Sequence, residues 1–441
     1  MIVLSGADVV LAGRVLSPGT IIIEDDTIVD IEAGARGPID GALHVALDGH
    51  LIVPGFIDVH VHGVAGLDVL DGPGAVRAVA ERLPRWGVTA FCPTTIACSP
   101  ASLTALFDDI AAIRTGGHVT GARVLPAHLE SNFIAADYRG AQPLACLRTP
   151  PADPRTLLSR PGDRSPQGRG AVPRTTPGRG TGVAFDSSET CSRRGDDESP
   201  AGDTDSYTAD DLLSTIGAYR SDVGIVTLAP ELDGGLDLVR ALHAAGIRVS
   251  LGHSGATYDE AVAAIEAGAR HATHLFNRMR PMSHRDPGLT GAVLASNEIA
   301  AELICDGVHV HPAALRVAIA AKRPERVMAI TDGTAGSGLP RGATASLGGY
   351  PITVGDTALL ADGTIAGSVL TMDKAFAVLA STVGASLVDC AAMCATTPAR
   401  ELGLQGLGVI AAGSKADLAV LDASFRVRQT WLGGVMVFSE Q

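Results

Sequence analysis

The sequence predicts an α/β fold in which a closed (β/α)8 TIM barrel carries a small β-sandwich domain built from both ends of the chain. Two observations support this fold. Between residues 51 and 398, short apolar segments alternate with helical patterns of roughly 10–15 residues, which is typical of βα units around a parallel sheet. Roughly eight such units follow one another, and that number favours a closed barrel over an open sheet.

The barrel elements follow from β-branched and apolar runs bounded by turn residues, and from apolar residues spaced at a helical period. The expected strands are Ile52–Val59, Thr89–Pro93, Arg123–Leu129, Val223–Leu228, Arg248–Gly252, His271–Leu275, Ala300–Cys305 and Val327–Thr331. The expected helices are Gly74–Trp86, Ser99–Thr115, Asp210–Tyr219, Asp237–Ala245, Tyr258–Ala267, Pro312–Lys322 and Met372–Thr382.

Both chain ends contain short strand patterns without helices between them. The strands expected there are Val9–Ala12, Gly19–Ile23, Thr27–Glu32, Ala416–Leu421, Val427–Leu432 and Val435–Phe438. The termini of a domain often lie close together. We therefore expect residues 1–50 and 399–441 to pair into the β-sandwich domain and residues 51–398 to form the barrel.

A segment at about 153–207 interrupts the barrel pattern. Only eight of the 48 residues from Arg160 to Tyr207 are apolar or aromatic, and the charge changes from basic to acidic at Asp196. Such a segment buries too little apolar surface to offset the entropy lost on ordering. We expect a disordered or loosely packed insertion; a lid and an artefact of the reading frame are the alternatives.

The composition excludes several classes of protein. The formal net charge is −14 and aromatic residues make up 4%, which disfavours binding to nucleic acid or to an anionic membrane. The seven cysteines form no CxxC pair and are odd in number, so we expect reduced thiols in a cytoplasmic protein rather than disulfides. The first residues lack the pattern of a signal peptide, and we find no apolar run of about 20 residues that could span a membrane.

The strongest functional signal is a set of histidines and a carboxylate that follow the carboxyl ends of different expected strands, where TIM-barrel active sites are built. They are His60, His62, Glu130, His253 and His274. His60 and His62 lie two residues apart along a strand and therefore face one side together. Glu130, His253 and His274 would form a two-histidine, one-carboxylate set, which catalytic zinc uses while leaving one position open for water.

Taken singly, each histidine also has a structural interpretation, because a histidine at a strand end can cap a neighbouring helix. Three such positions on different strands favour a shared metal site. His128 and His271 precede the ends of their strands, and we interpret them as structural residues or as support for the ligands.

Further residues suggest acid–base and anion chemistry. Asp332 follows a strand and could take a proton from water and return it to a leaving amine, although aspartate is also a good helix N-cap. His309 offers another imidazole at the barrel mouth. Arg285 suits a phosphate, with a surface ion pair as the alternative. Nucleotide-binding GxxxxGK[ST] and GxGxxG motifs and the GxSxG motif of serine hydrolases are absent from the sequence.

These motifs resemble the amidohydrolase superfamily and, within it, the N-acetylglucosamine-6-phosphate deacetylases. The matching stretches are residues 54–63 (PGFIDVHVHG), 128–130 (HLE), 226–231 (VTLAPE), 252–254 (GHS), 273–277 (THLFN), 285–288 (RDPG), 306–309 (DGVH), 331–332 (TD) and 363–368 (GTIAGS). Outside the insertion, they span nearly the whole chain.

The resemblance implies hydrolysis of N-acetylglucosamine-6-phosphate to glucosamine-6-phosphate and acetate by a homodimer with one or two divalent metals, zinc above all. It implies that Glu130, His253 and His274 hold one metal and that His60 and His62 hold a second in relatives that use two. Asp332 would be the general base and then the acid, with His309 stabilising the oxyanion. The implied sugar-phosphate contacts are Ala141, Asn277, Arg278, Arg285, Asp306, Val308, His309, Ile365, Ala366 and Gly367.

Three departures from the family pattern affect the site. Ser131 and Asn132 stand where the family has Gly-Pro, Gln142 stands where it has a histidine, and Gly333 follows Asp332 where alanine is common. Two other functions remain open. The chain could hydrolyse another N-acyl or cyclic-amide substrate, or it could be a catalytically silent relative that serves as a binding scaffold.

Overall fold

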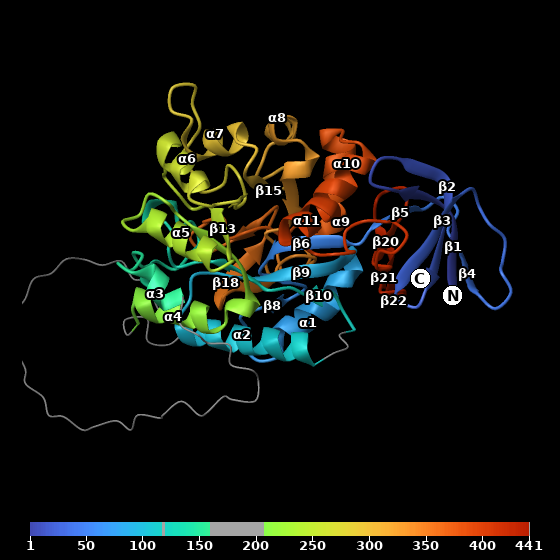
Figure 1. Cartoon of the computed structure of the whole chain (residues 1–441), viewed down its shortest axis with the longest axis horizontal. Helices are drawn as coiled ribbons and strands as arrows, with labels where there is room; N and C mark the ends of the chain where they lie inside the picture. Colours follow the sequence, from blue (N-terminus) through green and yellow to red (C-terminus); the bar gives the residue numbers. More distant parts are fainter. Residues whose placement is uncertain (117–119, 159–206, 441) are drawn as a thin grey trace, which may run out of the picture.

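The computed structural model describes residues 1–116, 120–158 and 207–440. Through its centre runs a sheet in which every neighbouring pair of strands is parallel (Figure 1). Its strands are β6 (Phe56–Val61), β9 (Val88–Thr95), β10 (Arg123–Val124), β11 (Ala127–Glu130), β12 (Val223–Leu228), β13 (Arg248–Leu251), β14 (His271–Ala272), β15 (Ala300–Ile304) and β16 (Val327–Ile330). Both β10 and β11 pair with β9, so they share one position in the barrel.

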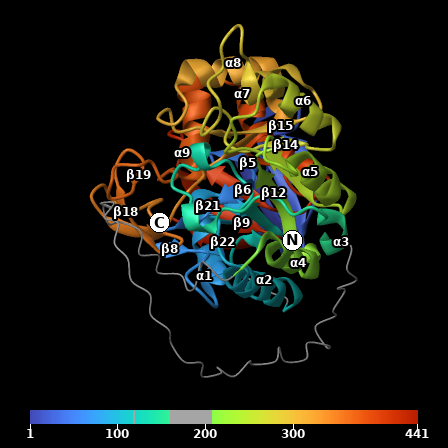
Figure 2. The ribbon, with the colours of Figure 1, turned by 90° about the vertical axis from the view of Figure 1, so that its left-hand side faces the viewer.

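The sheet closes on itself between its last and first strands. The backbone N–H of Asp332, just after β16, donates to the carbonyl O of His60 in β6 at 2.9 Å. The N–H of His62 donates to the carbonyl O of Gly333 at 2.8 Å. With helices around the outside of these strands (Figure 2), the (β/α)8 barrel predicted from the sequence is confirmed.

The helices cover apolar strands that are buried on both faces. β9 and β15 are buried along their whole length, as parallel strands between helices and barrel interior should be. Side-chain caps begin several helices, with capping boxes at Thr208 and Thr257. The helices are α1 (Ala75–Arg82), α2 (Pro100–Thr115), α3 (Pro154–Leu158), α4 (Ala209–Ala218), α5 (Gly235–Ala244), α6 (Tyr258–Glu266), α7 (Gly288–Ala295), α8 (Pro312–Lys322), α9 (Met372–Ala377), α10 (Leu387–Ala391) and α11 (Thr397–Leu402).

Several elements differ from those expected. The strand expected at His271–Leu275 ends at Ala272, because His274 and Phe276 adopt positive φ angles of 31° and 80° that take the chain out of the sheet. The helix expected at Met372–Thr382 is α9 followed by a π-helical segment, Val378–Val383. Helix α7 and two small antiparallel sheets were not expected; the sheets are β7 (Gly63–Val64) with β8 (Leu67–Asp68), and β17 (Thr344–Leu347) with β18 (Tyr350–Val354) and β19 (Ala358–Leu359).

Both chain ends build one further sheet, beside which the N- and C-termini lie (Figure 1). Its order is β22-β21-β20-β5-β1-β2-β3, and β4 also pairs with β1. Strand β20 from the C-terminal end runs antiparallel to β5 from the N-terminal end. The two ends share a core, in which Leu4, Ile23 and Trp431 are buried. The strands are β1 (Ile2–Val10), β2 (Val15–Glu24), β3 (Thr27–Ala33), β4 (Leu43–Ala46), β5 (Leu51–Pro54), β20 (Leu418–Leu421), β21 (Val427–Leu432) and β22 (Val435–Ser439).

The terminal β domain expected from the sequence is therefore present, while its limits at residues 50 and 399 stay a prediction. Of the insertion expected at 153–207, residues 159–206 lie outside the described residues. Residues 154–158 form α3, so the first residues of the expected insertion are helical. No helix within the described residues combines the length and apolar character needed to cross a membrane.

Candidate metal centre and active site

The predicted metal ligands meet at the carboxyl end of the barrel. His60 lies near the end of β6, and Glu130 is the last residue of β11. His62, His253 and His274 lie in the loops directly after β6, β13 and β14. All five side chains are buried, with at most 4% of each residue exposed. Because parallel strands place their carboxyl ends at one rim, residues from 60 to 274 converge without being close in sequence.

Glu130, His253 and His274 form the tighter of two clusters. Oε1 of Glu130 lies 2.8 Å from Nε2 of His253 and 2.8 Å from Nε2 of His274. The two Nε2 atoms are 3.0 Å apart. Three donor atoms of a carboxylate and two imidazoles thus point at one another, which is the donor set of a catalytic zinc site.

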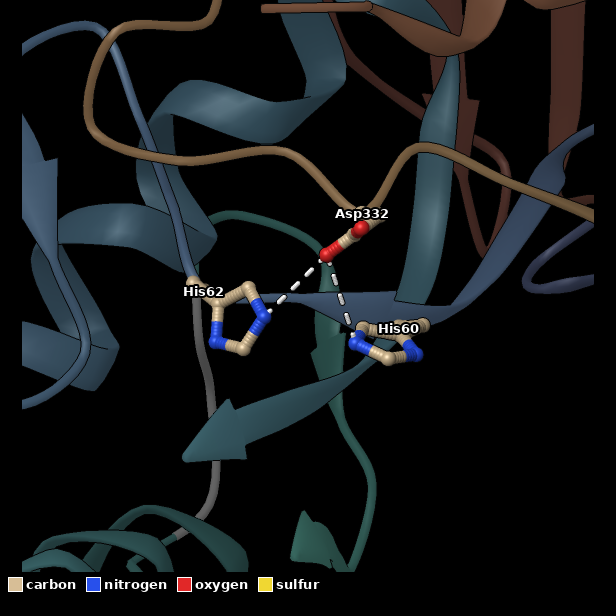
Figure 3. A group of neighbouring side chains, drawn as sticks. All are labelled: His60, His62 and Asp332. Carbon is tan, nitrogen blue, oxygen red and sulfur yellow. Dashed lines mark ion pairs between the residues drawn. The ribbon is translucent and has the colours of Figure 1, made fainter. Parts of the chain in front are cut away.

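His60, His62 and Asp332 form the second cluster (Figure 3). Oδ1 of Asp332 lies 3.4 Å from Nε2 of His60 and 3.2 Å from Nε2 of His62. The carboxylate oxygens of Glu130 are 3.8 Å from each of these Nε2 atoms. Glu130 therefore lies between the two clusters and faces both.

The hydrogen bonds behind the rings test whether these groups fit a metal. Nδ1 of His253 lies 2.8 Å from the carbonyl O of Tyr138, and Nδ1 of His62 lies 3.1 Å from the carbonyl O of Thr94. A carbonyl oxygen only accepts, so each Nδ1 carries a proton, and in the neutral form of either ring the lone pair of Nε2 points toward a carboxylate. Lone pairs that face one another repel unless a cation lies between them, so the donors fit a divalent metal.

The site also stores backbone strain. His253, His274 and Asp332 adopt φ angles of 48°, 31° and 48°, which non-glycine residues rarely occupy. Such strain of order 1–3 kcal/mol per residue persists where the surroundings impose it and gathers at functional sites. Here it directs three side chains from loop positions toward the two clusters.

The clusters concentrate negative charge in a buried place. Burial lowers the pKa of His60, but the nearby carboxylates, Asp332 first among them, outweigh burial and raise it to about 10. Burial raises the pKa of Glu130 and of Asp332, yet the imidazoles facing them hold both pKa values below the usual range. Both carboxylates are therefore ionised near neutral pH, and the site favours cations.

A cavity of about 750 Å³ opens over the clusters. Its lining includes the predicted residues His62, Glu130, Ala141, His253, Asn277, Arg278, His274, His309, Asp332, Ile365 and Gly367. Three further residues from the loop after β11, Asp137, Tyr138 and Gly140, also line it. Sequence reasoning missed these three, and their only signal is their position in the chain shortly after Glu130.

Four of the predicted substrate contacts lie outside the lining of this cavity. Arg285 is exposed on the loop before α7, and Val308 is 52% exposed. Ala366 is fully buried and its N–H donates to the carbonyl O of Ala358. Asp306 accepts from the N–H groups of Val308 and His309 and, through Oδ2 at 2.6 Å, pairs with Nδ1 of His309.

The departures from the family pattern are accommodated by hydrogen bonds. Ser131 Oγ donates to the carbonyl O of Thr227 at 2.5 Å. Asn132 Nδ2 donates to the carbonyl oxygens of Cys98 and Cys146 at 2.9 and 2.7 Å. These bonds hold the loop after Glu130 to two neighbouring segments without a proline.

The other two departures also have local partners. Gln142 donates through Nε2 to Oε2 of Glu130, and its Oε1 accepts from the N–H of Ala97 at 2.7 Å. A Cβ at Gly333 would lie 2.8 Å from Oγ of Ser337, closer than side chains pack. Position 333 therefore has too little space for the Cβ of an alanine, and glycine fits there.

Two buried residues lie next to the candidate ligand His60. His128 is within hydrogen-bond distance of the carbonyl O of Val59 and of Thr227 Oγ1, in keeping with its expected supporting role. Glu302, which sequence reasoning missed, contacts Nδ1 of His60 at 3.0 Å. Its signal was present, because a carboxylate in the middle of an otherwise apolar strand needs a polar partner.

Histidine and carboxylate ligands at the carboxyl end of a (β/α)8 barrel define a class of metal-dependent hydrolases. The Amidohydrolase family matches residues 51–437 of this chain. The chain is 34% identical to the N-acetylglucosamine-6-phosphate deacetylase of Homo sapiens, over 97% of this chain and 90% of the relative. It is 30% identical to the N-acetylgalactosamine-6-phosphate deacetylase of Escherichia coli O157:H7, over 88% of each.

A solved structure shares the fold of this chain. It is an N-acetyl-D-glucosamine-6-phosphate deacetylase variant from Mycobacterium smegmatis in complex with N-acetyl-D-glucosamine-6-phosphate, with a TM-score of 0.79 and 29% identity over 99% of both chains. This chain belongs to the amidohydrolase family and, within it, to the N-acetylglucosamine-6-phosphate deacetylases.

Proposed function

We propose that this chain hydrolyses the N-acetyl group of N-acetylglucosamine-6-phosphate and releases acetate and glucosamine-6-phosphate. One observation carries the proposal: Glu130, His253 and His274 converge within hydrogen-bond distance at the floor of a cavity that Asp332 also lines. The human relative is named for this reaction, and the Mycobacterium smegmatis relative is described in complex with this sugar phosphate.

The metal would be held by residues from both clusters. Glu130, His253 and His274 would hold one divalent ion. His60, His62 and Oδ1 of Asp332 would hold a second, which leaves Oδ2 of Asp332 for proton transfer. Imidazole and carboxylate donors in this combination suit zinc. A bound divalent metal polarises an amide carbonyl and lowers the pKa of water.

Asp332 supplies the proton transfers. Its carboxylate is ionised and lines the cavity, so it can accept a proton from the attacking water. The hydroxide oxygen forms a bond to the carbonyl carbon of the acetamide. The bond from that carbon to nitrogen then breaks, and Asp332 returns the proton to the departing amine, leaving acetate and the free amino sugar.

His309, which also lines the cavity, would donate to the oxyanion. Its Nδ1 pairs with Asp306 at 2.6 Å, while Nε2 lies 3.4 Å from Oγ1 of Thr357. A doubly protonated ring held by the Asp306 carboxylate would donate its Nε2–H to the developing oxyanion. Asp306 acts through His309, since its own oxygens accept from the ring and from two backbone N–H groups.

The phosphate would meet cationic side chains at the cavity wall. Arg278 lines the cavity, whereas Arg285 is exposed outside its lining. Within one chain, we therefore assign the main phosphate contact to Arg278. Arg285 stays a contact predicted from the family resemblance. Asn277, Ala141, Ile365 and Gly367 would border the sugar.

Three further properties follow from the family resemblance and are proposed with it: zinc as the native metal, a homodimer, and a cytoplasmic location. The location is supported by cysteines that are free and buried throughout the described residues, which suits a reducing compartment.

Acetate release tests the proposed reaction. The purified chain is incubated with zinc and N-acetylglucosamine-6-phosphate, and the Asp332→Asn variant serves as the control. Acetate from the wild type alone is expected. No acetate with zinc still bound would point to a different N-acyl substrate, and no acetate without bound zinc would point to a silent scaffold.

The galactosamine epimer is the second candidate substrate, because a relative of 30% identity is named for it. The ratio of kcat/KM for the two epimers, measured on the same preparation, decides between them.

A further inference from the structure

Behind the metal-ligand candidates lies a titratable side chain that the proposed reaction does not use. Glu302, in the middle of β15, is fully buried. Its Oε2 lies 3.0 Å from Nδ1 of His60, whose Nε2 faces Asp332 and Glu130. Glu302 therefore contacts the back of the His60 ring, on the side opposite the candidate metal.

Glu302 does not form a third metal site, although its donor atoms and those of His60 and His128 lie within 4.8 Å of one another. Nδ1 of His128 is 2.9 Å from the carbonyl O of Val59, which only accepts, so this nitrogen carries a proton. It has no lone pair to offer a metal shared with Glu302. The remaining role of Glu302 is exerted through His60.

His60 differs in this respect from the other histidine ligands. His62 and His253 have neutral carbonyl oxygens behind Nδ1, and Nδ1 of His274 has no hydrogen-bond partner. Among these four rings, His60 alone has a carboxylate behind it. A carboxylate behind an imidazole fixes which nitrogen carries the proton, fixes the ring orientation and strengthens the ring as a donor.

We propose that Glu302 is a positioning residue that holds the proton of His60 on Nδ1 and selectively strengthens the metal position formed by His60, His62 and Asp332. This inference rests on the proposed metal-dependent function. It implies that the metal affinity of the two clusters depends unequally on Glu302, because the cluster of Glu130, His253 and His274 has no such carboxylate behind its rings.

The charge of Glu302 supports the same role. Its Oε1 has no hydrogen-bond partner, and the titratable groups around it include His60, His128, His271 and the thiol of Cys92. A buried carboxylate with an unpaired oxygen destabilises a protein unless an opposite charge lies nearby. A cation on the far side of His60 supplies that charge, so metal binding and Glu302 stabilise each other.

Two variants separate charge from geometry. Glu302→Gln keeps an oxygen that can accept from His60 Nδ1 but removes the charge, and Glu302→Asp keeps the charge but withdraws it by one methylene. Glu401→Gln is the matched control, because Glu401 lies 3.8 Å from Nε2 of His271 and contacts none of the ligands. Zinc affinity is measured by competition with a chelator, and the melting temperature is measured with and without zinc.

Both Glu302 variants are expected to bind zinc at the position of His60, His62 and Asp332 about 10–100-fold less tightly, while Glu401→Gln keeps the wild-type affinity. Zinc should raise the melting temperature of Glu302→Gln less than that of the wild type.

Equal zinc affinity in the wild type and the Glu302 variants would overturn the role of Glu302 and leave the metal site intact. A folded wild type that retains no zinc would overturn the proposed metal-dependent function instead. If Glu302→Gln does not fold, the zinc affinity of Glu302→Asp decides by the same comparison.

Discussion

The backbone N–H of Asp332 donates to the carbonyl O of His60 at 2.9 Å, and this bond both helps to close the barrel and sets the Asp332 carboxylate against the His60 ring. The loop after β16 therefore cannot move away from β6 without separating the proposed general base from the candidate metal ligands. The same contact takes part in closing the barrel and in placing Asp332 in the site. It therefore holds the site in the fixed geometry that catalysis requires.

Arg278 and Arg285 should contribute unequally to phosphate recognition. Removing a charge-assisted hydrogen bond costs about 1.5–3 kcal/mol, or roughly 10–150-fold in affinity. Because Arg278 lines the cavity, Arg278→Ala should raise KM for the phosphorylated substrate by about this factor and leave KM for N-acetylglucosamine nearly unchanged. Steady-state kinetics with both substrates measure the difference.

Arg285→Ala is the comparison for that variant, because Arg285 is exposed outside the cavity lining. In the isolated chain we expect a smaller effect than for Arg278→Ala. A larger effect of Arg285→Ala on the phosphorylated substrate would contradict the assignment of Arg278 as the main contact.

Gln142 should stabilise Glu130 in its ligand position. Its amide is oriented by the Ala97 N–H, so its Nε2 donates to the Glu130 oxygen that does not contact His253. Gln142→Leu leaves two buried groups unpaired, each of which costs about 1–3 kcal/mol. We expect a lower free energy of unfolding in urea and weaker zinc binding. The same substitution at the exposed Gln405 is the control, and equal losses in both variants would refute this role.

Asn132 should replace the rigidity that a proline supplies in the family. Its side chain bonds the carbonyl oxygens of Cys98 and Cys146, which belong to separate segments. Asn132→Ala removes both bonds, and we expect the free energy of unfolding to fall by about 2 kcal/mol. Urea denaturation measures this loss, with the exposed Asn297→Ala as the control. Unchanged stability would mean that the loop after Glu130 is held in another way.

Glu401 should make the stability of the fold depend on pH in acid. Burial raises its pKa, but the His271 ring, 3.8 Å away, and the hydrogen bond from Arg400 outweigh burial and lower it to about 2, from 4.5 in a model peptide. A depressed folded pKa stabilises the fold above about pH 4.5, and this contribution is lost as the pH falls towards 2. Glu401→Gln should therefore be less stable at neutral pH and should lose less stability than the wild type between pH 4.5 and 2.

Urea midpoints measured across that range test the Glu401 prediction. Parallel pH profiles for the wild type and Glu401→Gln would show that other carboxylates dominate the acid response. The distance of Glu401 from the candidate ligands allows the experiment to be done without added metal.

Local patterns in the sequence were enough to predict the barrel and the residues that lie at its carboxyl rim. Apolar runs that alternate with helical periods predicted the βα units, and histidines just after those runs predicted which side chains meet. This worked because every parallel strand of a barrel brings its carboxyl end to the same rim, so a position relative to a strand end is also a position in space. The same logic was weaker for loops, where His274 and Phe276 end the strand early through positive φ angles.

What the sequence determined by itself is the fold class and the chemistry of the rim, since both follow from periodicity and residue type along the chain. Only the tertiary structure decided which groups stand behind the ligands and which arginine reaches the cavity. Glu302 and His60 are separated by 242 positions, and nothing local to either residue indicates the other. Arg278 and Arg285 belong to one loop, and only its path between β14 and α7 places one at the cavity and the other in solvent. Contacts of this kind depend on how elements pack in three dimensions, and a pattern read along one chain does not contain that information.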